Sequence, residues 1–231
     1  MKLSPSLYAA DPLRLHEAIE AVSPYSASFH VDIMDGRFAP AFGLGESLVR
    51  RLVREYPIPV DVHLMVERPE AWAERFAGLG ARSVAFHLEA TPEPEALLHA
   101  VRKAGARAYM ALLPDTPLVA SEPFLPAADG VLLLTAPPGG GAFSNEALAR
   151  LEKLPAAMHA IIDGSLQEEH LRLPVLSRVQ LAVLGKALFD SRDVADRARE
   201  LADALEASTF RHDTQRDRLD GECRPTGGSS R

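Results

Sequence analysis

Histidines and aspartates occupy alternating positions in two predicted strands, and a third predicted strand ends in an aspartate. Because successive side chains in a strand point to opposite faces, residues two positions apart share a face. Clustered imidazoles and carboxylates are what a divalent metal site or a proton-transfer site requires. One such residue alone would ordinarily be a capping or solvated side chain, but three strands with the same feature indicate a common site. The residues are His30 and Asp32 in strand 29–33, Asp61 and His63 in strand 60–65, and Asp163 at the end of strand 158–163.

Short apolar segments alternate with amphipathic segments along most of the chain, with brief connections between them. The first helix is expected to open at Asp11-Pro12, since Asp is a good N-cap and Pro a good first helical residue. Eight strand-helix units of about 25 residues predict an α/β fold, a closed parallel (β/α)8 TIM barrel. The predicted strands are 2–8, 29–33, 60–65, 83–87, 106–112, 130–135, 158–163 and 179–184, and the predicted helices are 11–22, 45–55, 69–78, 93–104, 116–126, 145–154, 167–171 and 191–207.

The C-terminal end differs in composition from the rest of the chain. Residues 211–231 are polar, charged and rich in Gly and Ser, with hardly any apolar residue. Such a segment cannot bury enough apolar surface to offset its chain entropy. We therefore expect a single barrel domain over residues 1–208 and a disordered tail over residues 209–231.

Composition excludes several classes of protein. No apolar run approaches the ~20 residues that span a bilayer, and the N-terminus lacks the apolar region of a signal peptide. The formal net charge of -7 and the lack of a Lys/Arg stripe argue against nucleic-acid binding. The single cysteine, Cys223, permits no intrachain disulfide and no thiolate zinc cluster. We therefore expect a cytoplasmic protein that does not bind membranes, and a small phosphorylated substrate stays compatible with its charge.

In a barrel of this kind, functional groups lie at the carboxyl ends of the strands. His30, Asp32, His63 and Asp163 would all face that mouth, as a mixed nitrogen and oxygen ligand set for a divalent ion such as Zn, Fe, Mn or Co. Asp32 and Asp163 come from strands well separated around the ring, so they could approach a substrate from opposite sides. One could remove a proton next to a carbonyl and the other could return it on the opposite face, through an enediolate stabilised by the metal.

Glycine-containing segments follow three neighbouring strands. Glycine lets backbone amides approach an anion closely, and the loops after strands seven and eight often bind phosphate in this fold. Any one of these segments alone could be an ordinary turn. Beside them, Ser6 ends strand one, Met34 and Met65 follow the ligand candidates, and His87 with Glu89 closes strand four as a supporting pair or as surface residues. The predicted phosphate contacts are Gly139, Gly140 and Gly141, then Gly164 and Ser165, then Gly185 and Lys186.

These motifs resemble the ribulose-phosphate 3-epimerases, including their allulose-6-phosphate 3-epimerase branch, over about residues 1 to 208. The resemblance implies a (β/α)8 barrel that interconverts D-ribulose 5-phosphate and D-xylulose 5-phosphate with a divalent metal. It also implies that His30, Asp32, His63 and Asp163 are metal ligands, that Asp32 and Asp163 are the acid/base pair, that Ser6 and His63 contact substrate, and that Met34 and Met65 cover the reacting carbon. The motifs are Ser4-Pro5-Ser6-Leu7, His30 to Gly36, Asp61 to Met65, His87-Leu88-Glu89-Ala90 and Asp163-Gly164.

The second half of the chain departs from the family pattern. The segment from Pro137 to Phe143 is shorter than the family's phosphate loop and lacks its Gln, Gly164-Ser165 replaces two glycines, and Gly185-Lys186 stands where Gly-Ser is expected. The pattern Asp-x-Lys-x-x-Asp of related phosphate-binding decarboxylases does not occur, since position 34 is Met. A substrate other than ribulose 5-phosphate is therefore an open alternative.

The primary hypothesis is a metal-dependent 3-epimerase of D-ribulose 5-phosphate. The alternatives are a 3-epimerase of another phosphosugar such as allulose 6-phosphate, and a non-catalytic barrel that binds a phosphorylated metabolite. Retention of both Asp32 and Asp163 argues against the last, because binding alone needs no opposed acid/base pair. The expected partners are a phosphorylated ketose and further copies of the chain in a homo-oligomer.

Overall fold

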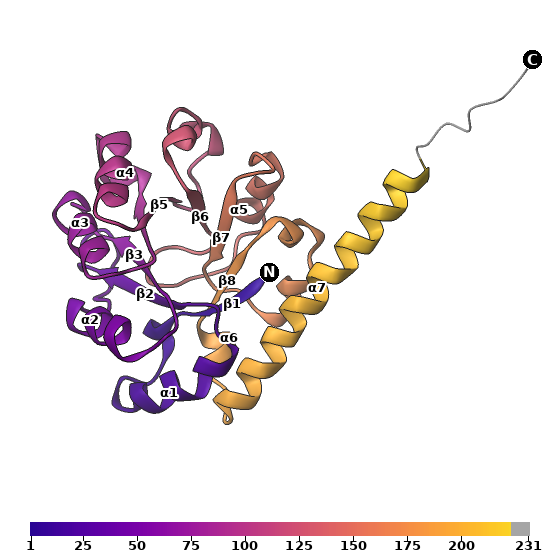
Figure 1. The fold of residues 1–231 in the computed structure, drawn as a ribbon, viewed down its shortest axis with the longest axis horizontal. Helices are drawn as coiled ribbons and strands as arrows, with labels where there is room; N and C mark the ends of the chain where they lie inside the picture. Colours follow the sequence, from indigo (N-terminus) through magenta and orange to yellow (C-terminus); the bar gives the residue numbers. More distant parts are fainter. Residues whose placement is uncertain (223–231) are drawn as a thin grey trace, which may run out of the picture.

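The structure, a computed structural model, describes residues 1–222 and the side chains up to residue 208. Eight parallel strands form one sheet in the order β1-β8-β7-β6-β5-β4-β3-β2, and the helices lie outside this ring (Figure 1). The predicted (β/α)8 barrel is confirmed. The strands are β1 Lys2–Pro5, β2 Phe29–Met34, β3 Val60–Met65, β4 Ser83–His87, β5 Arg107–Leu112, β6 Gly130–Leu134, β7 His159–Asp163 and β8 Leu181–Leu184. The α-helices are α1 Leu15–Val22, α2 Glu46–Glu55, α3 Glu70–Gly78, α4 Pro94–Lys103, α5 Asn145–Ala149, α6 Lys186–Phe189 and α7 Val194–Glu222.

The seam between β1 and β2 closes the ring. These strands stand at the two ends of the ladder order and meet through an isolated bridge between Ser6 and His30. Side chains reinforce the seam, since the hydroxyl oxygens of Ser4 and Ser28 lie 2.9 Å apart and both residues are buried. The barrel is therefore nearly closed, with one seam held by few backbone hydrogen bonds.

Strand alternation divides the buried residues into two layers. Outward-facing residues such as Val31 and Val62 belong to the large apolar core that packs under the helices. Inside the barrel, β4 to β8 contribute a smaller apolar cluster, whereas β2 and β3 point His30, Asp32 and His63 inward. One side of the barrel interior is thus apolar and the other is polar. The inner cluster comprises Ala85, Tyr109, Ala111, Leu132, Leu134, Ile161, Leu181 and Val183.

Several predicted helices in the second half are 3-10 turns. Residues 116–126 form η5 (Leu118–Ala120) and η6 (Glu122–Ala127), and the predicted helix at 167–171 is η8 (Glu168–Arg172). Proline removes a backbone donor and restricts the preceding residue, so the proline-rich segment 116–126 cannot propagate an α-helix. Asp11 is an N-cap as predicted, because its carboxylate accepts a hydrogen bond from the Leu13 amide at 2.9 Å. It caps the 3-10 turn η2 (Pro12–Arg14), however, and α1 begins only at Leu15.

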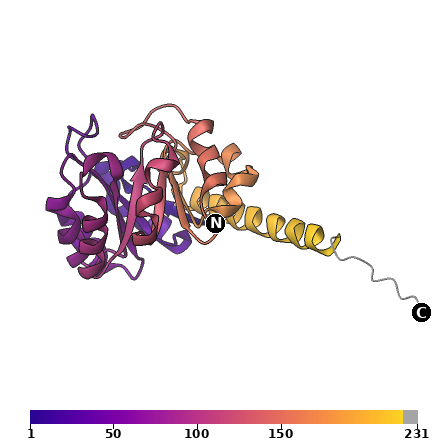
Figure 2. The same ribbon diagram turned by 90° about the horizontal axis from the view of Figure 1, so that it is seen from above.

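The last helix is longer than predicted. α7 continues past the expected end at Ala207 to Glu222, and its C-terminal part extends away from the barrel in Figures 1 and 2. The sequence contains no proline or glycine between Ala207 and Gly221, so nothing in it interrupts the helical backbone there. The predicted disordered tail lies outside the described residues over 223–231, and the domain boundary at residue 208 stays a prediction.

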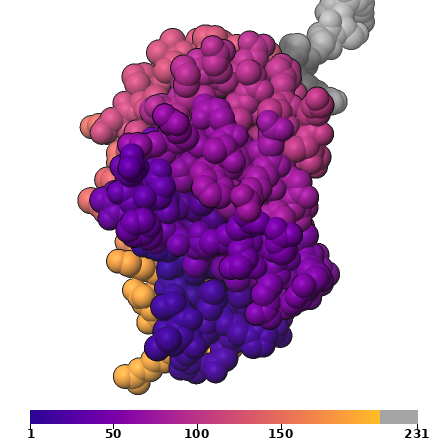
Figure 3. All heavy atoms as spheres, turned by 90° about the vertical axis from the view of Figure 1, so that its left-hand side faces the viewer, coloured from indigo at the N-terminus to yellow at the C-terminus, as the bar shows by residue number. Residues whose placement is uncertain are grey.

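Helices α1 to α4 cover the side of the barrel that belongs to the N-terminal half of the chain, which Figure 3 shows in indigo to magenta. The first part of α7 packs against α1 and β1, so the C-terminal helix covers the strand that begins the chain. Among the described residues, no helix has both the length and the hydropathy that crossing a bilayer would require.

Candidate active site

Four polar side chains from three strands converge inside the barrel mouth. His30 Nε2 lies 3.2 Å from Asp32 Oδ1 and 3.5 Å from Asp163 Oδ2. His63 Nδ1 lies 3.4 Å from Asp32 Oδ1 and 3.2 Å from Asp163 Oδ2. Asp32 is paired with His63 in the β2–β3 register, so these two side chains lie at the same height along neighbouring strands. The structure thus brings together the four residues that the sequence predicts as metal ligands.

The chemistry of this cluster fits a divalent cation. The His30 ring nitrogens, Asp32 Oδ1 and His63 Nδ1 are buried and have no hydrogen-bond partner among the described residues. A buried polar atom without a partner costs free energy, so native proteins rarely leave several of them together. One potential ligand atom from each of the four residues can be chosen so that all lie within 4.8 Å of one another. Mixed imidazole and carboxylate sites of this kind suit Zn, Fe, Mn or Co.

Opposite charges within the cluster shift the pKa values of all four groups. Burial alone would lower the pKa of His30, but the charge of Asp32 and the contact with Asp163 raise it well above the usual value. The pKa of His63 is raised by the same two carboxylates against the effect of burial. Burial would raise the pKa values of Asp32 and Asp163, but the histidines lower both. Without a metal, the opposite charges within the cluster therefore favour protonated imidazoles beside ionised carboxylates.

A cavity of about 600 Å³ opens above the cluster at the carboxyl ends of the strands. Asp32 and Asp163 are in its wall, whereas His30 and His63 are not among its lining residues. Lys186 is the one lysine or arginine among those lining residues. Except for His63, every predicted substrate contact lines this cavity. These residues are Ser6, Met34, Met65, Gly139, Gly140, Gly141, Gly164, Ser165, Gly185 and Lys186.

Two loops of the cavity wall are tied to each other. The Ser165 hydroxyl donates to the Gly141 carbonyl at 2.7 Å, and the Phe143 ring stacks on His170 with centroids 3.8 Å apart. Ser165 has φ +54°, the one non-glycine residue in the left-handed region within residues 1–222. Gly164 has φ +111°, and a Cβ there would lie 2.6 Å from the Ala136 amide nitrogen. Glycine at 164 is therefore required by both backbone conformation and space.

The residue pattern of the first 189 residues identifies the family. The model of the ribulose-phosphate 3-epimerase family matches residues 2–189. The chain belongs to this family. Curated relatives include the ribulose-phosphate 3-epimerases of Mycobacterium leprae, 35% identical over 201 residues (83% of this chain, 89% of the relative), and of Aquifex aeolicus, 30% identical over 209 residues (86% and 94%). The protein is thus an enzyme of the epimerase type.

Solved structures with a similar fold include a 3-hexulose-6-phosphate synthase, with TM-score 0.70, 20% identity, and coverage of 89% of this chain and 100% of that chain. Another is KGPDC from Streptococcus mutans in complex with D-R5P, with TM-score 0.70, 16% identity, and coverage of 89% and 97%. At these identities the likeness shows the barrel fold alone.

Two aspartates near the epimerase site have other partners. Asp35 accepts hydrogen bonds from the amides of Arg37, Phe38 and Glu67, so it shapes the loop after β2. Asp61, which shares a strand face with His63, is bound by Arg82 and by the Ser83 hydroxyl. Neither belongs to the candidate metal cluster.

Contacts outside the cluster support two of its members. The Ser6 hydroxyl donates to Asp32 Oδ2 at 2.7 Å. On the other side, His63 Nε2 lies 3.0 Å from His87 Nε2, and His87 Nδ1 lies 3.3 Å from Glu89 Oε2. Burial lowers the pKa of His87 to about 4. Burial opposes ionisation of Glu89, but hydrogen bonds from His87 and Thr116 lower its pKa to about 2. His87 is therefore a neutral imidazole between His63 and a carboxylate.

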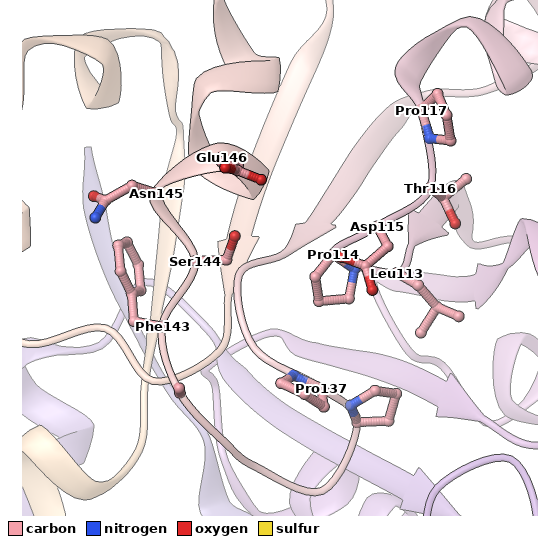
Figure 4. Close-up of a pocket in the computed structure, with 12 residues that line it drawn as sticks. Leu113, Pro114, Asp115, Thr116, Pro117, Pro137, Phe143, Ser144, Asn145 and Glu146 are labelled. Carbon is pink, nitrogen blue, oxygen red and sulfur yellow. The ribbon is translucent and has the colours of Figure 1, made fainter.

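A second cavity of about 780 Å³ lies beside the first. In Figure 4, Leu113 and Thr116 line one side of it, and Phe143 and Glu146 line the other. Arg150 donates to the carbonyls of Leu113 and Thr116 at 2.7 Å each, and so holds the first of these two segments. Sequence reasoning missed Arg150, because an arginine in a predicted amphipathic helix gives no signal that its side chain turns inward.

Proposed function

We propose that this enzyme inverts the configuration at C3 of a ketose phosphate, D-ribulose 5-phosphate to D-xylulose 5-phosphate, in a metal-dependent reaction. One observation carries the proposal: Asp32 and Asp163 both line the cavity and both face the histidine pair, yet they come from β2 and β7. Inversion of one stereocentre needs two acid/base groups that reach the carbon from different sides. The names of the curated relatives support the substrate.

In this proposal the two carboxylates exchange protons with opposite faces of C3. Asp32 removes the proton, and Asp163 supplies a proton to the other face. The Ser6 hydroxyl donates a hydrogen bond to Asp32 Oδ2 and so orients the carboxylate. The lowered pKa of Asp32 keeps it ionised and ready to accept the C3 proton. Asp163 carries a proton when the ketose binds, and it gives up that proton as Asp32 gains one. The histidines also lower the pKa of Asp163, which makes it a stronger acid for this transfer. In the reverse reaction the two residues exchange roles.

A divalent ion held by His30, Asp32, His63 and Asp163 would supply positive charge beside the substrate oxygens and so increase the acidity of the C3 proton. Met34 and Met65 pack with Ala39 in an apolar cluster next to the cavity. These side chains would keep water away from the carbanionic intermediate. Apolar walls also strengthen the electrostatic contacts within the site.

The phosphate is proposed to lie against the glycine-rich loops after β6, β7 and β8. Backbone amides at glycines can approach an anion closely. Lys186 adds a positive charge to a cavity wall that also carries Asp32 and Asp163. A dianionic phosphate would therefore bind near Lys186 and leave the carbonyl end of the sugar near the carboxylates.

Two features of the wall favour a second candidate, a 3-epimerase of a larger ketose phosphate such as allulose 6-phosphate. Ser165 holds the loop after β6 through its bond to Gly141, and Lys186 places a long side chain in the same cavity. Both act at the end of the cavity proposed for the phosphate, where a pentose and a hexose phosphate differ most in reach. The chemistry at C3 would be the same.

Deuterium exchange tests the proposal. Metal-loaded protein is incubated with ribulose 5-phosphate in heavy water, and deuterium at C3 is measured by NMR together with xylulose 5-phosphate formation. We expect both. Exchange on allulose 6-phosphate but not on ribulose 5-phosphate would move the assignment to the hexose epimerase, and exchange on neither ketose would refute proton transfer at C3.

The variant Asp163→Asn tests the acid/base role of Asp163. Removing one acid/base group should lower epimerisation at least about 100-fold, the usual lower range for general acid/base catalysis. Because Asp163 is also a proposed ligand, metal content is measured beside activity. Loss of activity in a metal-loaded, folded variant supports the acid/base role, and undiminished turnover would refute it.

A cytoplasmic location and assembly into a homo-oligomer stay predictions. Subcellular fractionation and light scattering of the purified protein test them separately.

A further inference from the structure

We propose that Glu89, acting through His87, fixes the ring orientation and the proton position of the metal ligand His63. Both are positioning residues, since neither lines the substrate cavity or belongs to the four-residue metal cluster. The inference rests on the proposed metal site. It assigns a role to the His-Leu-Glu segment that ends β4.

A chain of contacts leads from the cluster to Glu89. His63 presents Nδ1 to the two aspartates, and its Nε2 lies 3.0 Å from His87 Nε2. His87 Nδ1 then lies 3.3 Å from Glu89 Oε2. The two rings have centroids 5.1 Å apart, and both histidines are fully buried. Bulk water therefore cannot replace a missing partner at either imidazole, whereas Glu89 at the outer end of the chain of contacts is in reach of solvent.

Counting protons leaves one arrangement. A neutral imidazole has one N–H donor and one acceptor nitrogen. A metal that uses the Nδ1 lone pair of His63 leaves the proton on Nε2, which points at His87. His87 must accept that proton with its own Nε2, so its own proton lies on Nδ1. An ionised carboxylate can only accept, and Glu89 faces that nitrogen.

Without the carboxylate, His87 could carry its proton on Nε2. Two N–H groups would then face each other across 3.0 Å, and either His63 would rotate or the contact would break. The carboxylate removes this alternative tautomer. Partners of this kind behind a metal-binding histidine fix its orientation and increase its basicity.

Glu89 is itself held in place. Its Oε1 accepts hydrogen bonds from the Leu113 amide at 2.9 Å and from the Thr116 hydroxyl. Arg150 fixes the same segment from its carbonyl side. Leu113 and Thr116 lie on the segment that lines the second cavity in Figure 4. The carboxylate therefore has three donors and little freedom to turn away from His87.

Zinc affinity tests the role of Glu89. Competition with a chromophoric chelator at constant pH compares the wild type with Glu89→Gln. This variant keeps the shape of the side chain but has a single acceptor oxygen for the donors that Glu89 meets on two sides. We expect zinc binding about 10-fold to 100-fold weaker. Glu70→Gln is the matched control, because Glu70 also accepts a hydrogen bond from a threonine, Thr91, but lies outside the metal cluster. Its zinc affinity should equal that of the wild type.

Histidine NMR tests the same inference without a variant that could fail to fold. In zinc-loaded protein with ¹⁵N-labelled histidine, we expect His63 with its proton on Nε2 and His87 with its proton on Nδ1. A proton on Nε2 of His87, or a Glu89→Gln variant that binds zinc as tightly as the wild type, would overturn the inference and leave the proposed function standing. A wild type that binds no zinc, manganese or cobalt would overturn both.

Discussion

A divalent metal should raise the unfolding temperature of this protein, and the rise should grow with pH. The pKa values of His30 and His63 are raised because the charges and contacts of Asp32 and Asp163 outweigh the effect of burial. In metal-free protein both imidazoles are therefore protonated below about pH 6.5, their ordinary pKa, and their attraction to the two carboxylates then stabilises the fold fully. This stabilisation is lost as pH rises through the raised pKa values of the two histidines. Metal binding depends on pH in the opposite direction, because the metal must displace both protons.

The structure sets the size of the effect. Displacement of two protons changes metal affinity by up to about 100-fold per pH unit. Metal at 100 times its Kd stabilises the fold by about 2.7 kcal/mol, which for a domain of this size raises the midpoint by about 5 to 10 °C. Each further 100-fold gain in affinity adds a similar amount. From pH 6 to pH 7 at constant manganese, the shift should therefore increase by about 5 to 10 °C.

Scanning calorimetry with manganese or with chelator measures this shift at the two pH values. His63→Gln should remove most of the shift. His99→Gln changes an exposed histidine on α4 and should leave the shift and its pH dependence unchanged. A metal-induced shift that is constant or decreases between pH 6 and pH 7 would refute the reasoning about displaced protons.

Three further predictions concern the scaffold and the cavity wall. Arg82→Ala leaves the buried Asp61 carboxylate without its cation and should cost about 3 kcal/mol of stability in urea unfolding, with unchanged kcat; equal stability would contradict it. A Cβ at Gly43 would overlap the backbone of β2, so Gly43→Ala should lower both stability and activity, whereas Gly45→Ala, which meets nothing within 4 Å, should have little effect on either. Ser165→Ala loses the hydrogen bond to the loop after β6 and should raise KM with kcat nearly unchanged; a change in kcat alone would count against the proposed phosphate position.

Strand periodicity and barrel register were enough to predict the cluster. His30, Asp32 and His63 follow from alternation on two strands, and Asp163 follows from its place at the end of the seventh strand. The same alternation places Asp61 on the face of His63, but it contains no information about depth along the strand. Asp61 lies near the amino end of β3, where Arg82 and Ser83 bind it. A two-residue period therefore predicts the face of a side chain and not its neighbours.

Contacts between segments far apart in the chain could not be predicted from the sequence. The His87 and Glu89 pair was visible as two polar residues at a strand end, but its partners His63, Leu113 and Thr116 come from two other parts of the chain. The long α7 was missed for a different reason. Its C-terminal part has too few apolar residues for the sequence to predict a packed helix there.

The order of strands in the ring has a consequence for biosynthesis. Three proposed ligands lie on β2 and β3, but Asp163 is translated only after β4, β5 and β6. β1 is made first, yet its ladder partner is β8, the last strand. A nascent chain therefore carries a partial ligand set and unpaired strand edges until β8 has left the ribosome, and such edges are sites where chains pair wrongly with one another. Translation pauses between β3 and β7 would prolong that exposed state.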